Sequence, residues 1–425
     1  MPGTALTDRF GNPLADALPY ARGDILRDTA DDHAKLRRAW RIVEERHRAG
    51  TLYNFTGLKR SFVPGDADPA LLDDELAPAL YGERLEELAL EHLGGTPGRD
   101  DVLVTNRLTA AIFVAMQVLV QPGDTVVGVS PGYSHPAVLR AVRAAGGVLV
   151  ETRSADELAE ALAGFEEPPL VVLTRLPVTY EPFGNEELEA VLAVARERSA
   201  VIFADDAGGA RVGPAVLGQP KTLELGVVAG ATGLDKYGTT GPRLGLLAGR
   251  RELVAQMRAR ALELGMEARP MLYPAVVHSL AGYRPERVRE LVAATEQLYE
   301  ALQARGLGDV LTRTQVAVRL DGEDVLAEAM RRGNVAEPPI VPIEATAALA
   351  MLLLRDHGIL TVHFAALPPG TAALLLKFIP PETLEKLGGP DAFASAVDTS
   401  LDELGRLLAS LDSVRDLLLG QIHHI

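Results

Sequence analysis

Two short stretches of the sequence carry residues that can do covalent chemistry. Asp205 and Asp206 follow the apolar run 201–204, and Lys236 comes 31 residues after Asp205. Arg243 follows Lys236 at a distance of seven residues. A lysine in a partly dry cleft loses its proton more readily and then attacks carbonyl groups to form a Schiff base. An arginine near it is suited to an anionic group such as a phosphate. The two stretches predict a site for covalent amine chemistry if the fold brings them together.

The elements that must position these residues alternate between strands and helices from about residue 100 to 250. Short β-branched runs predict strands, and the amphipathic segments between them predict helices, one of which is opened by Asn185 as N-cap. This alternation is typical of a three-layer, mostly parallel α/β sheet, in which ligands bind at the carboxyl ends of the strands. The predicted strands are 102–104, 126–129, 148–150, 170–173, 201–204 and 226–231, and the predicted helices include 109–119 and 136–145.

The rest of the chain has a different pattern. Helices are predicted over 251–264, 285–305 and 399–411, and strands over 315–320, 359–365 and 373–379. This mixture indicates a smaller α+β domain at the C-terminus. The N-terminal region reads as a helical arm with one helix over 33–47. We therefore expect three parts: an arm (1–50), a large ligand-binding domain (51–280) and a small domain (281–425).

Composition excludes several classes of site. The chain of 425 residues has 42 Lys and Arg against 58 Asp and Glu, a net charge of −16, and no cysteine. It cannot form a disulfide, a thiol nucleophile or a thiolate metal site, and no metal site is predicted. The acidic charge disfavours nucleic acid as a partner. The first residues do not resemble a secretory signal, and apolar stretches such as 347–354 are too short for a bilayer, so we expect a cytoplasmic protein without a membrane partner.

The order of the motifs resembles the fold-type I enzymes that depend on pyridoxal 5′-phosphate (PLP), the aspartate aminotransferase superfamily. Asp205 and Ala207 match its Asp-x-Ala motif, and Lys236 is followed by a Gly-x-Arg-x-Gly tail that contains Arg243. The resemblance implies that Asp205 pairs with the pyridine nitrogen, Lys236 forms the Schiff base and Arg243 binds the phosphate. It also assigns Ala207 and Thr232 to the cofactor site. Some features are similar to the selenocysteine-synthase and β-eliminating lyase branches.

The stretch 105–111 follows the first predicted strand and opens a helix, where free N–H groups favour a phosphate. It resembles the family's Ser/Thr-Gly-x-x-Ala phosphate cup, although Arg107 and Leu108 stand where glycines are common. We expect Arg107, Leu108 and Thr109 to bind the cofactor phosphate. The alternative is a simple helix cap by Thr105 or Thr109.

The stretch 130–136 holds the residue that the family stacks on the cofactor ring. The resemblance favours His135, with Tyr133 as the other choice, and His135 is also expected to be catalytic. The alternative is that His135 only caps the helix that begins at Pro136.

The loop 174–184 occupies the place of the family's Asn-Pro loop but lacks the Asn-Pro core. Thr179 or Arg175 is the candidate for the hydrogen bond to the cofactor's phenolic oxygen. This departure counts against a standard class I aminotransferase.

The substrate-binding residues are the least specific part of the resemblance. Tyr81, Arg269 and Lys377 are the candidates, and His363 is a further donor. Lys377 stands where the family has an arginine for the substrate carboxylate. The alternative for Tyr81 is packing in the core, and the alternative for Lys377 is a solvent-facing position on an edge strand. Asp235 is expected to form a salt bridge at the surface.

These assignments imply a PLP-dependent enzyme that acts on a small-molecule amine, with Lys236 as nucleophile and general base. An aminotransferase is the first hypothesis. A lyase (β-elimination, retro-aldol or selenium transfer) is the second, and a non-catalytic regulator with the same fold is the third. The resemblance also implies a homodimer or a higher homo-oligomer.

Overall fold

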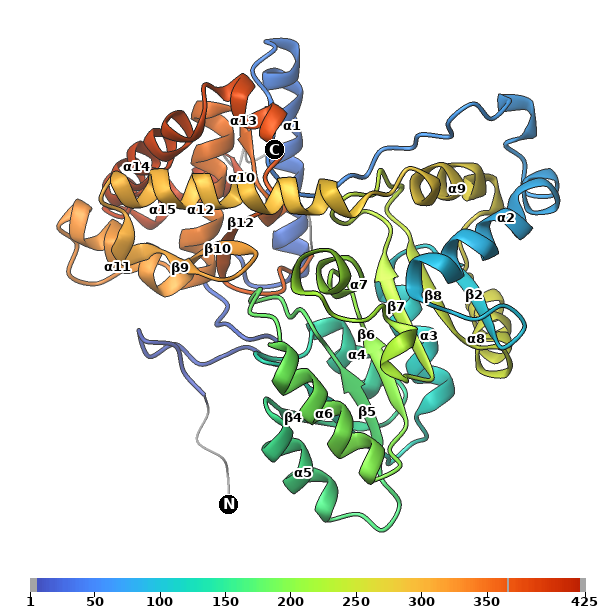
Figure 1. Ribbon diagram of the computed structural model, residues 1–425. Coiled ribbons are helices and arrows are strands. Elements are labelled where there is room, and N and C mark those ends of the chain that lie inside the picture. Colours follow the sequence, from blue (N-terminus) through green and yellow to red (C-terminus); the bar gives the residue numbers. More distant parts are fainter. Residues whose placement is uncertain (1–5, 365–366, 421–425) are drawn as a thin grey trace. The chain divides into compact units, whose positions relative to one another are not determined.

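The computed structural model describes residues 6–364 and 367–420 of the chain (Figure 1). The chain divides into two compact units, one formed by Met1–Gly57 with Glu290–Ile425 and the other by Leu58–Arg289. We call them the arm-containing unit and the sheet unit. The expected division at residues 50 and 280 into three domains stays a prediction. Within the described residues, no helix has both the length and the apolar character needed to cross a membrane.

The sheet unit contains a seven-stranded sheet (Figure 1). Only β8 runs antiparallel to its neighbours, and the other adjacent strands are parallel. The predicted mostly parallel sheet is therefore confirmed. The strands in spatial order are β2 (Asp100–Thr105), β8 (Gly245–Arg250), β7 (Ala229–Gly233), β6 (Ile202–Asp205), β5 (Leu170–Leu173), β3 (Thr125–Val129) and β4 (Val148–Thr152).

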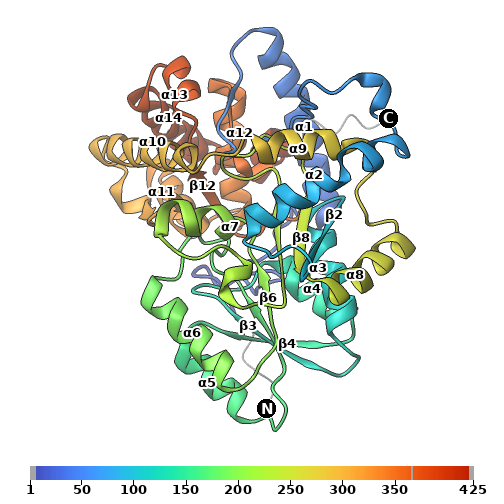
Figure 2. The same ribbon diagram turned by 45° about the vertical axis from the view of Figure 1, so that its right-hand side comes forward.

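Helices cover both faces of this sheet, which gives three layers (Figure 2). Alternate strand residues face opposite ways, so Phe203 joins the core on one face while Ile202 and Ala204 join the other. Helices α3 (Leu108–Leu119), α4 (Pro136–Ala144) and α8 (Arg251–Leu264) contribute to the first core. Helices α2 (Leu76–Leu93), α5 (Ala155–Ala163), α6 (Asn185–Glu197) and α9 (Tyr273–Ala281) contribute to the second.

Some boundaries in the sheet unit differ from the sequence predictions. The strand predicted over 226–231 is β7, which starts later because Gly226 ends a short 3-10 helix with a left-handed φ of 84°. Asn185 is the first residue of α6 rather than its N-cap, a position that Gly184 holds. The Asn185 amide instead donates to Leu217 O at 3.1 Å. Strand β8 was not predicted.

The arm-containing unit is mainly helical, with a core built around α12 (Pro342–His357), which is buried over most of its length. The apolar run 347–354 is therefore core sequence. A three-stranded antiparallel sheet and a parallel pair of short strands complete the unit. Its other elements are α1 (Thr29–Arg48), α10 (Pro285–Ala304, which begins in the sheet unit), α11 (Gly322–Gly333), α13 (Pro381–Leu387), α14 (Pro390–Leu407), α15 (Leu411–Leu419), β1 (Tyr53–Asn54), β9 (Thr312–Arg313), β10 (Ala317–Asp321), β11 (Ile359–Leu360) and β12 (Ala373–Lys377).

Three predicted elements in this unit differ from the structure. The strand predicted over 359–365 is only β11, because Val362–Phe364 form a 3-10 helix, and residue 365 lies outside the described residues. The strand predicted over 373–379 ends at Lys377, since Phe378 takes a φ of +49° that leaves the extended region. The helix predicted over 399–411 is the second half of α14, and α15 is a separate helix.

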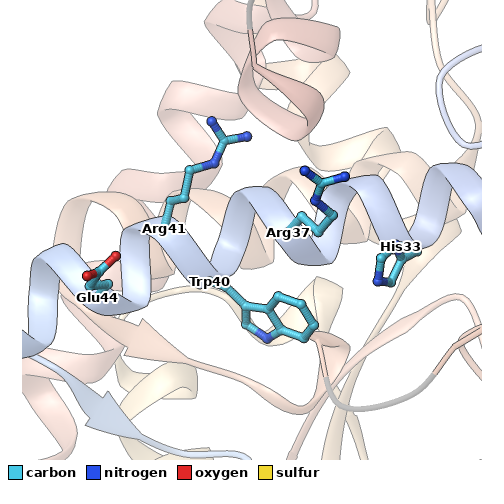
Figure 3. Close-up of a pocket in the computed structure, with 5 residues that line it drawn as sticks. All are labelled: His33, Arg37, Trp40, Arg41 and Glu44. Carbon is cyan, nitrogen blue, oxygen red and sulfur yellow. The ribbon is translucent and has the colours of Figure 1, made fainter.

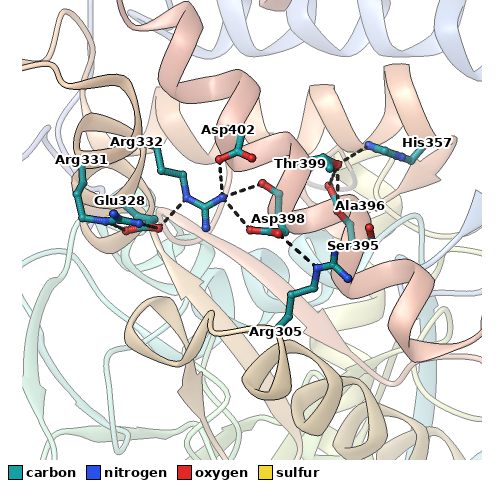
Figure 4. A network of polar contacts seen from close by, with 10 residues as sticks. All are labelled: Arg305, Glu328, Arg331, Arg332, His357, Ser395, Ala396, Asp398, Thr399 and Asp402. Atoms are coloured by element: carbon teal, nitrogen blue, oxygen red, sulfur yellow. Dashed lines mark hydrogen bonds and ion pairs between the residues drawn. The ribbon is translucent and has the colours of Figure 1, made fainter.

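An ionic network joins α11 to α14 (Figure 4). The Arg332 guanidinium donates to Glu328 at 2.7 Å on its own helix and to Asp398 and Asp402 on α14, each at 2.8 Å. Arg305 donates to the second oxygen of Asp398 at 3.3 Å. Asp402 and Arg305 are largely exposed, so each of their two pairs contributes about 1 kcal/mol at most, whereas Arg332 and Glu328 are mostly buried.

The exposed side of α1 forms a shallow depression lined by His33, Arg37, Trp40, Arg41 and Glu44 (Figure 3). The Trp40 ring packs edge-on against His33 with centroids 6.0 Å apart. This depression belongs to the arm-containing unit, whereas every residue predicted to bind the cofactor belongs to the sheet unit.

Replacing Gly358 by alanine is expected to destabilise the arm-containing unit by several times the amount caused by Gly306→Ala. Both glycines have left-handed φ angles, +70° and +82°, which cost an alanine about 1 kcal/mol. A Cβ on Gly358 would also lie 1.7 Å from Thr51 O, whereas no heavy atom lies within 4 Å of a Cβ on Gly306. Urea unfolding of the two variants measures the difference. Equal losses of unfolding free energy would contradict the close contact.

Candidate functional site

Asp205 ends strand β6 in the interior of the sheet unit and is 1% exposed. Its carboxylate accepts a hydrogen bond from the backbone N–H of Ala207, but its Oδ1 has no hydrogen-bond partner among the residues that the structure describes. Burial, and then the charge of Asp206, raise the pKa of Asp205 to about 7, against the opposing effect of Lys236. A buried carboxylate with an open oxygen is costly for the fold and suits a cationic N–H partner.

Asp206, the next residue, has a different role. The Arg175 guanidinium donates to its Oδ1 at 3.1 Å and also bonds Oδ2, which accepts from Thr222 Oγ1 at 2.7 Å. Arg175 donates further to Pro220 O at 2.7 Å. Asp206 and Arg175 therefore neutralise each other inside the unit. Arg175 is not available for a cofactor, and Asp205 remains the carboxylate with an open oxygen.

Replacing Arg175 by methionine is expected to lower the free energy of unfolding by about 3–5 kcal/mol, because Asp206 would be left buried and uncompensated. The double variant with Asp206→Leu should recover most of that loss. As a control, Arg415→Met removes the exposed pair with Asp412 and should cost less than about 1 kcal/mol. Chemical denaturation measures all three. A double variant as unstable as the single one would contradict the argument.

Lys236 follows β7 and lies in the same part of the unit as Asp205. Its side chain is 20% exposed, and its Nζ lies 3.5 Å from Asp235 Oδ1. The other oxygen of Asp235 accepts from Arg60 Nε at 2.8 Å. Burial alone raises the pKa of Asp235, but the positive charges of Lys236 and Arg60 outweigh it and bring it to about 2. Asp235 was expected to form a salt bridge at the surface. It does form ion pairs, but it is buried, with 3% of its surface exposed.

His135 caps helix α4, as the alternative reading expected. Its Nδ1 accepts from the Ala137 N–H at 3.0 Å, which leaves the proton of the neutral ring on Nε2. Burial, and then the charges of Lys236 and Arg140, lower the pKa of His135 to about 4. The ring is therefore a neutral, half-buried surface near Lys236. Stacking by His135 or Tyr133 stays a prediction.

The N-terminus of α3 and Arg243 provide the groups predicted to bind the phosphate. Arg107 holds the N-cap position, so the expected caps by Thr105 or Thr109 are wrong, and no side chain caps the helix. The first-turn N–H groups of Leu108 and Thr109 therefore lack intrahelical partners. Burial, and then the charges of Arg60 and Arg107, lower the pKa of Arg243 to about 10, which places three guanidinium groups near one another. An anion here would relieve their mutual repulsion.

Thr232 ties the ends of β6 and β7 together. Its hydroxyl donates to Ala207 O at 3.0 Å and accepts from Arg211 Nη1 at 3.1 Å, and the same nitrogen donates to Gly233 O at 2.9 Å. Arg211 is completely buried, and burial lowers its pKa to about 10. Direct contact of Thr232 with a cofactor stays a prediction. Sequence reasoning missed Arg211, although it lies four residues after the Asp-x-Ala motif.

A pair of tyrosines was also missed. The hydroxyls of Tyr180 and Tyr237 are 2.6 Å apart, and both residues have positive φ angles, +60° and +26°. The Tyr237 ring lies where a side chain on Gly208 would be, because a Cβ there would be 2.5 Å from Tyr237 Cε2. A tyrosine directly after the lysine and a glycine directly after Asp-x-Ala are the signals that could have found this packing.

Thr179 precedes this pair and packs against the loop that carries Tyr133. A Cβ on Gly132 would lie 2.8 Å from Thr179 Oγ1, so only glycine permits this approach. The structure thus brings the two predicted cofactor loops together, while the hydrogen bond from Thr179 to a cofactor stays a prediction.

The predicted substrate residues lie on different elements. Tyr81 is half-buried on α2. Arg269 is 68% exposed and forms an ion pair with Asp74. Lys377 belongs to the arm-containing unit and is 1% exposed, with its Nζ donating to Thr56 O at 3.2 Å. The alternative of a solvent-facing Lys377 is wrong, although β12 is an edge strand.

His363, the further candidate, also lies in the arm-containing unit. Its ring is buried between Lys35, at 3.5 Å from Nδ1, and Thr346, at 3.2 Å from Nε2. Both ring nitrogens are thus occupied by neighbours of the same unit.

The chain is similar to known proteins in both sequence and fold. The chain is 29% identical to a "pyridoxal phosphate-dependent protein" of Methanothermobacter thermautotrophicus over 82% of this chain and 88% of that protein. It is 29% identical to a protein of the same description from Methanosphaera stadtmanae, over 75% and 80%. Aspartate aminotransferase from Thermus thermophilus with maleate matches with a TM-score of 0.54 and 21% identity, over 85% of this chain and 96% of that one.

N-Succinyldiaminopimelate aminotransferase from Mycobacterium tuberculosis matches with a TM-score of 0.56 and 17% identity, over 85% and 96%. At these identities the solved structures establish the fold alone. Residues 82–368, more than half of the chain, match the family described as aminotransferase class I and II. The chain therefore belongs to the class I and II aminotransferase family.

Proposed function

We propose that this protein is a PLP-dependent aminotransferase that acts on an amino acid or a related amine. PLP is the cofactor of the family and appears in the names of both relatives described above. The observation that carries the proposal is the open Oδ1 of buried Asp205 beside Lys236. The proposal includes a homodimer in the cytoplasm and includes neither nucleic acid nor a membrane as partner.

The residues of the sheet unit fit PLP group by group. Arg243, Arg107 and the N–H groups of Leu108 and Thr109 suit the phosphate, because they combine positive charge with unbonded donors. Asp205 suits the protonated ring nitrogen. His135 or Tyr133 would cover the ring, and the further residues assigned to it are Ala207, Thr179 and Thr232.

When bound, PLP supplies an aldehyde that takes up an amine and a ring that withdraws electrons from the bonds of the amine-bearing carbon. Lys236 Nζ would take the proton from the substrate Cα and would deliver it to C4′, the former aldehyde carbon of the cofactor. Asp205 would face the cationic N–H of the ring with its unpartnered Oδ1, and its negative charge would keep the proton on the ring nitrogen. Burial of Asp205 keeps water from competing for that hydrogen bond.

A lyase remains the second candidate because one observation favours it. The loop 174–184 lacks the Asn-Pro core, and its Arg175 is bound to Asp206 rather than open to a ligand. The hydrogen bonding around the ring therefore differs from that of a standard class I aminotransferase.

The test is to mix holo-protein with single amino acids and follow the cofactor spectrum and the products. For an aminotransferase we expect stoichiometric loss of the aldehyde form of the cofactor, reversed by a 2-oxo acid. Catalytic release of ammonia and a 2-oxo acid with the aldehyde form retained would overturn this in favour of the lyase. Tyr81, Arg269 and Lys377 remain proposals for substrate binding, and an increase in KM on replacing each one would support it.

A further inference from the structure

We infer that Asp235, held in place by Arg60, is a positioning residue that fixes the direction and the charge of the Lys236 ammonium group. The inference deepens the proposed function, since it concerns the nucleophile of the same site. It assigns a role to an aspartate that the resemblance leaves without one and to a segment, residues 58–60, outside every motif.

The Asp235 carboxylate lies between two cations, one on each oxygen. Oδ1 faces Lys236 Nζ at 3.5 Å, and Oδ2 accepts from Arg60 Nε at 2.8 Å. The side chain of Asp235 is 5% exposed, so water does not screen these interactions as it does at the surface. Arg60 thus fixes the carboxylate, and the carboxylate fixes the ammonium group.

The segment 58–60 is attached to the lysine by its backbone as well. The Lys59 N–H donates to Asp235 O at 3.0 Å, and Leu58 and Lys236 form an antiparallel bridge. On the other side, Thr239 Oγ1 contacts Leu234 O at 2.7 Å and Lys236 O at 2.6 Å. The backbone around Lys236 is held from both sides, which leaves the side chain as the movable part.

The other charged and titratable groups near Lys236 do not replace Asp235. Burial raises the pKa of Tyr180 and of Tyr237, and burial lowers that of His135 to about 4, so these three are neutral at neutral pH. Arg211 and Arg243 are cationic and act on Asp235 with the same sign as Lys236 and Arg60. Asp205 is the other carboxylate, and it faces the predicted ring nitrogen. Among these groups, Asp235 is the counter-charge of Lys236.

The two partners of Asp235 lead to opposite predictions. Asp235→Asn removes the negative charge beside Lys236 Nζ, so Lys236 should react with an acylating reagent at a lower pH than in the wild type. Arg60→Gln removes the second cation on Asp235, so Lys236 should react only at a higher pH. If Asp235 and Arg60 only held the fold together, the pH midpoint of Lys236 reactivity would shift in the same direction in both variants or in neither.

The first measurement uses the protein without cofactor. Trace acylation with acetic anhydride across a pH series, followed by digestion and mass spectrometry, gives the midpoint of reactivity of each lysine. Lys386, which is exposed and belongs to the arm-containing unit, is an internal control in the same digest. We expect the Lys236 midpoint to fall in Asp235→Asn, to rise in Arg60→Gln and to be restored in Asp235→Glu. Unchanged Lys236 midpoints in both variants would overturn the inference.

The second measurement uses the holo-protein, in which the pH midpoint of the cofactor's spectral change should move with the same signs. Circular dichroism of each variant checks that it is folded. The acylation result does not depend on turnover, so a failure of the proposed reaction is distinguishable from a failure of this inference. If no amino acid reacts but the Lys236 midpoints shift as expected, the proposed reaction is wrong and the role of Asp235 is supported.

Discussion

Lys236→Ala is expected to abolish covalent attachment of PLP and to lower turnover by about 10²–10⁴-fold or more, because it removes both the nucleophile and the general base. Borohydride reduction of the holo-protein should fix the mass of the cofactor on the peptide that contains Lys236. The variant should bind PLP only reversibly and lose it on dialysis. Its fold should be retained, since the side chain is partly exposed and its removal leaves Asp235 paired with Arg60.

Lys221→Ala is the matched control for this result. Lys221 belongs to the same unit, and its Nζ donates to Glu91 O at 2.5 Å near the surface. Attachment and turnover should be unchanged. If the cofactor mass persists in Lys236→Ala, or appears on another lysine peptide of the wild type, the assignment of the nucleophile is wrong.

Asp205→Asn is expected to stabilise the protein without cofactor while lowering its activity by about 10²–10³-fold. The folded-state pKa of Asp205 is about 7, above its ordinary value of 3.8, because burial disfavours the charged form. Its contribution to stability is therefore fully present below pH 4 and is lost as the pH rises to 7. Above that pH the wild type holds a buried charge, at a cost with an upper limit of about 4 kcal/mol.

The pH dependence provides the check. Thermal unfolding of the cofactor-free proteins should give similar midpoints at pH 4 and a higher midpoint for Asp205→Asn at pH 8. Added PLP should raise the midpoint of the wild type much more than that of the variant, because asparagine offers no charge to the ring nitrogen. A variant that is less stable than the wild type at pH 8 would contradict the cost assigned to the buried carboxylate.

The parts of the site that could be predicted from sequence are those coded by adjacent residues. The apolar run before Asp205 predicts a strand. The end of that strand predicts the position of the site, since ligands of a parallel sheet bind at the carboxyl ends of its strands. Asp205 and Lys236 were predicted in this way, and Arg243 was predicted from its spacing to Lys236. Strand β8 was not predicted, because its sequence Gly-Leu-Leu-Ala-Gly-Arg contains no β-branched or aromatic residue and directly continues the Gly-x-Arg-x-Gly tail.

The remaining parts depend on contacts between distant residues. Arg60 and Asp235 are 175 positions apart, and Tyr180 and Tyr237 are 57 apart. No local pattern in the sequence indicates that the members of either pair are in contact. Arg175 looks like a ligand residue from its place in the loop and is instead the counter-ion of Asp206. Local pattern identifies a charged residue at a strand end, but only the packed structure decides which of its neighbours neutralises it.

The sheet unit begins at Leu58, within three residues of Arg60. A cut made at this boundary, by expression of the unit alone or by limited proteolysis, therefore falls close to the residues that hold Asp235 and Lys236. The sequence alone does not show this proximity. A fragment that starts at residue 61 would keep the whole sheet and every family motif and would lose the hydrogen bonds of Lys59 and Arg60 to Asp235. Poor activity in such a fragment would result from the loss of these hydrogen bonds. It would not show whether the other unit takes part in the chemistry.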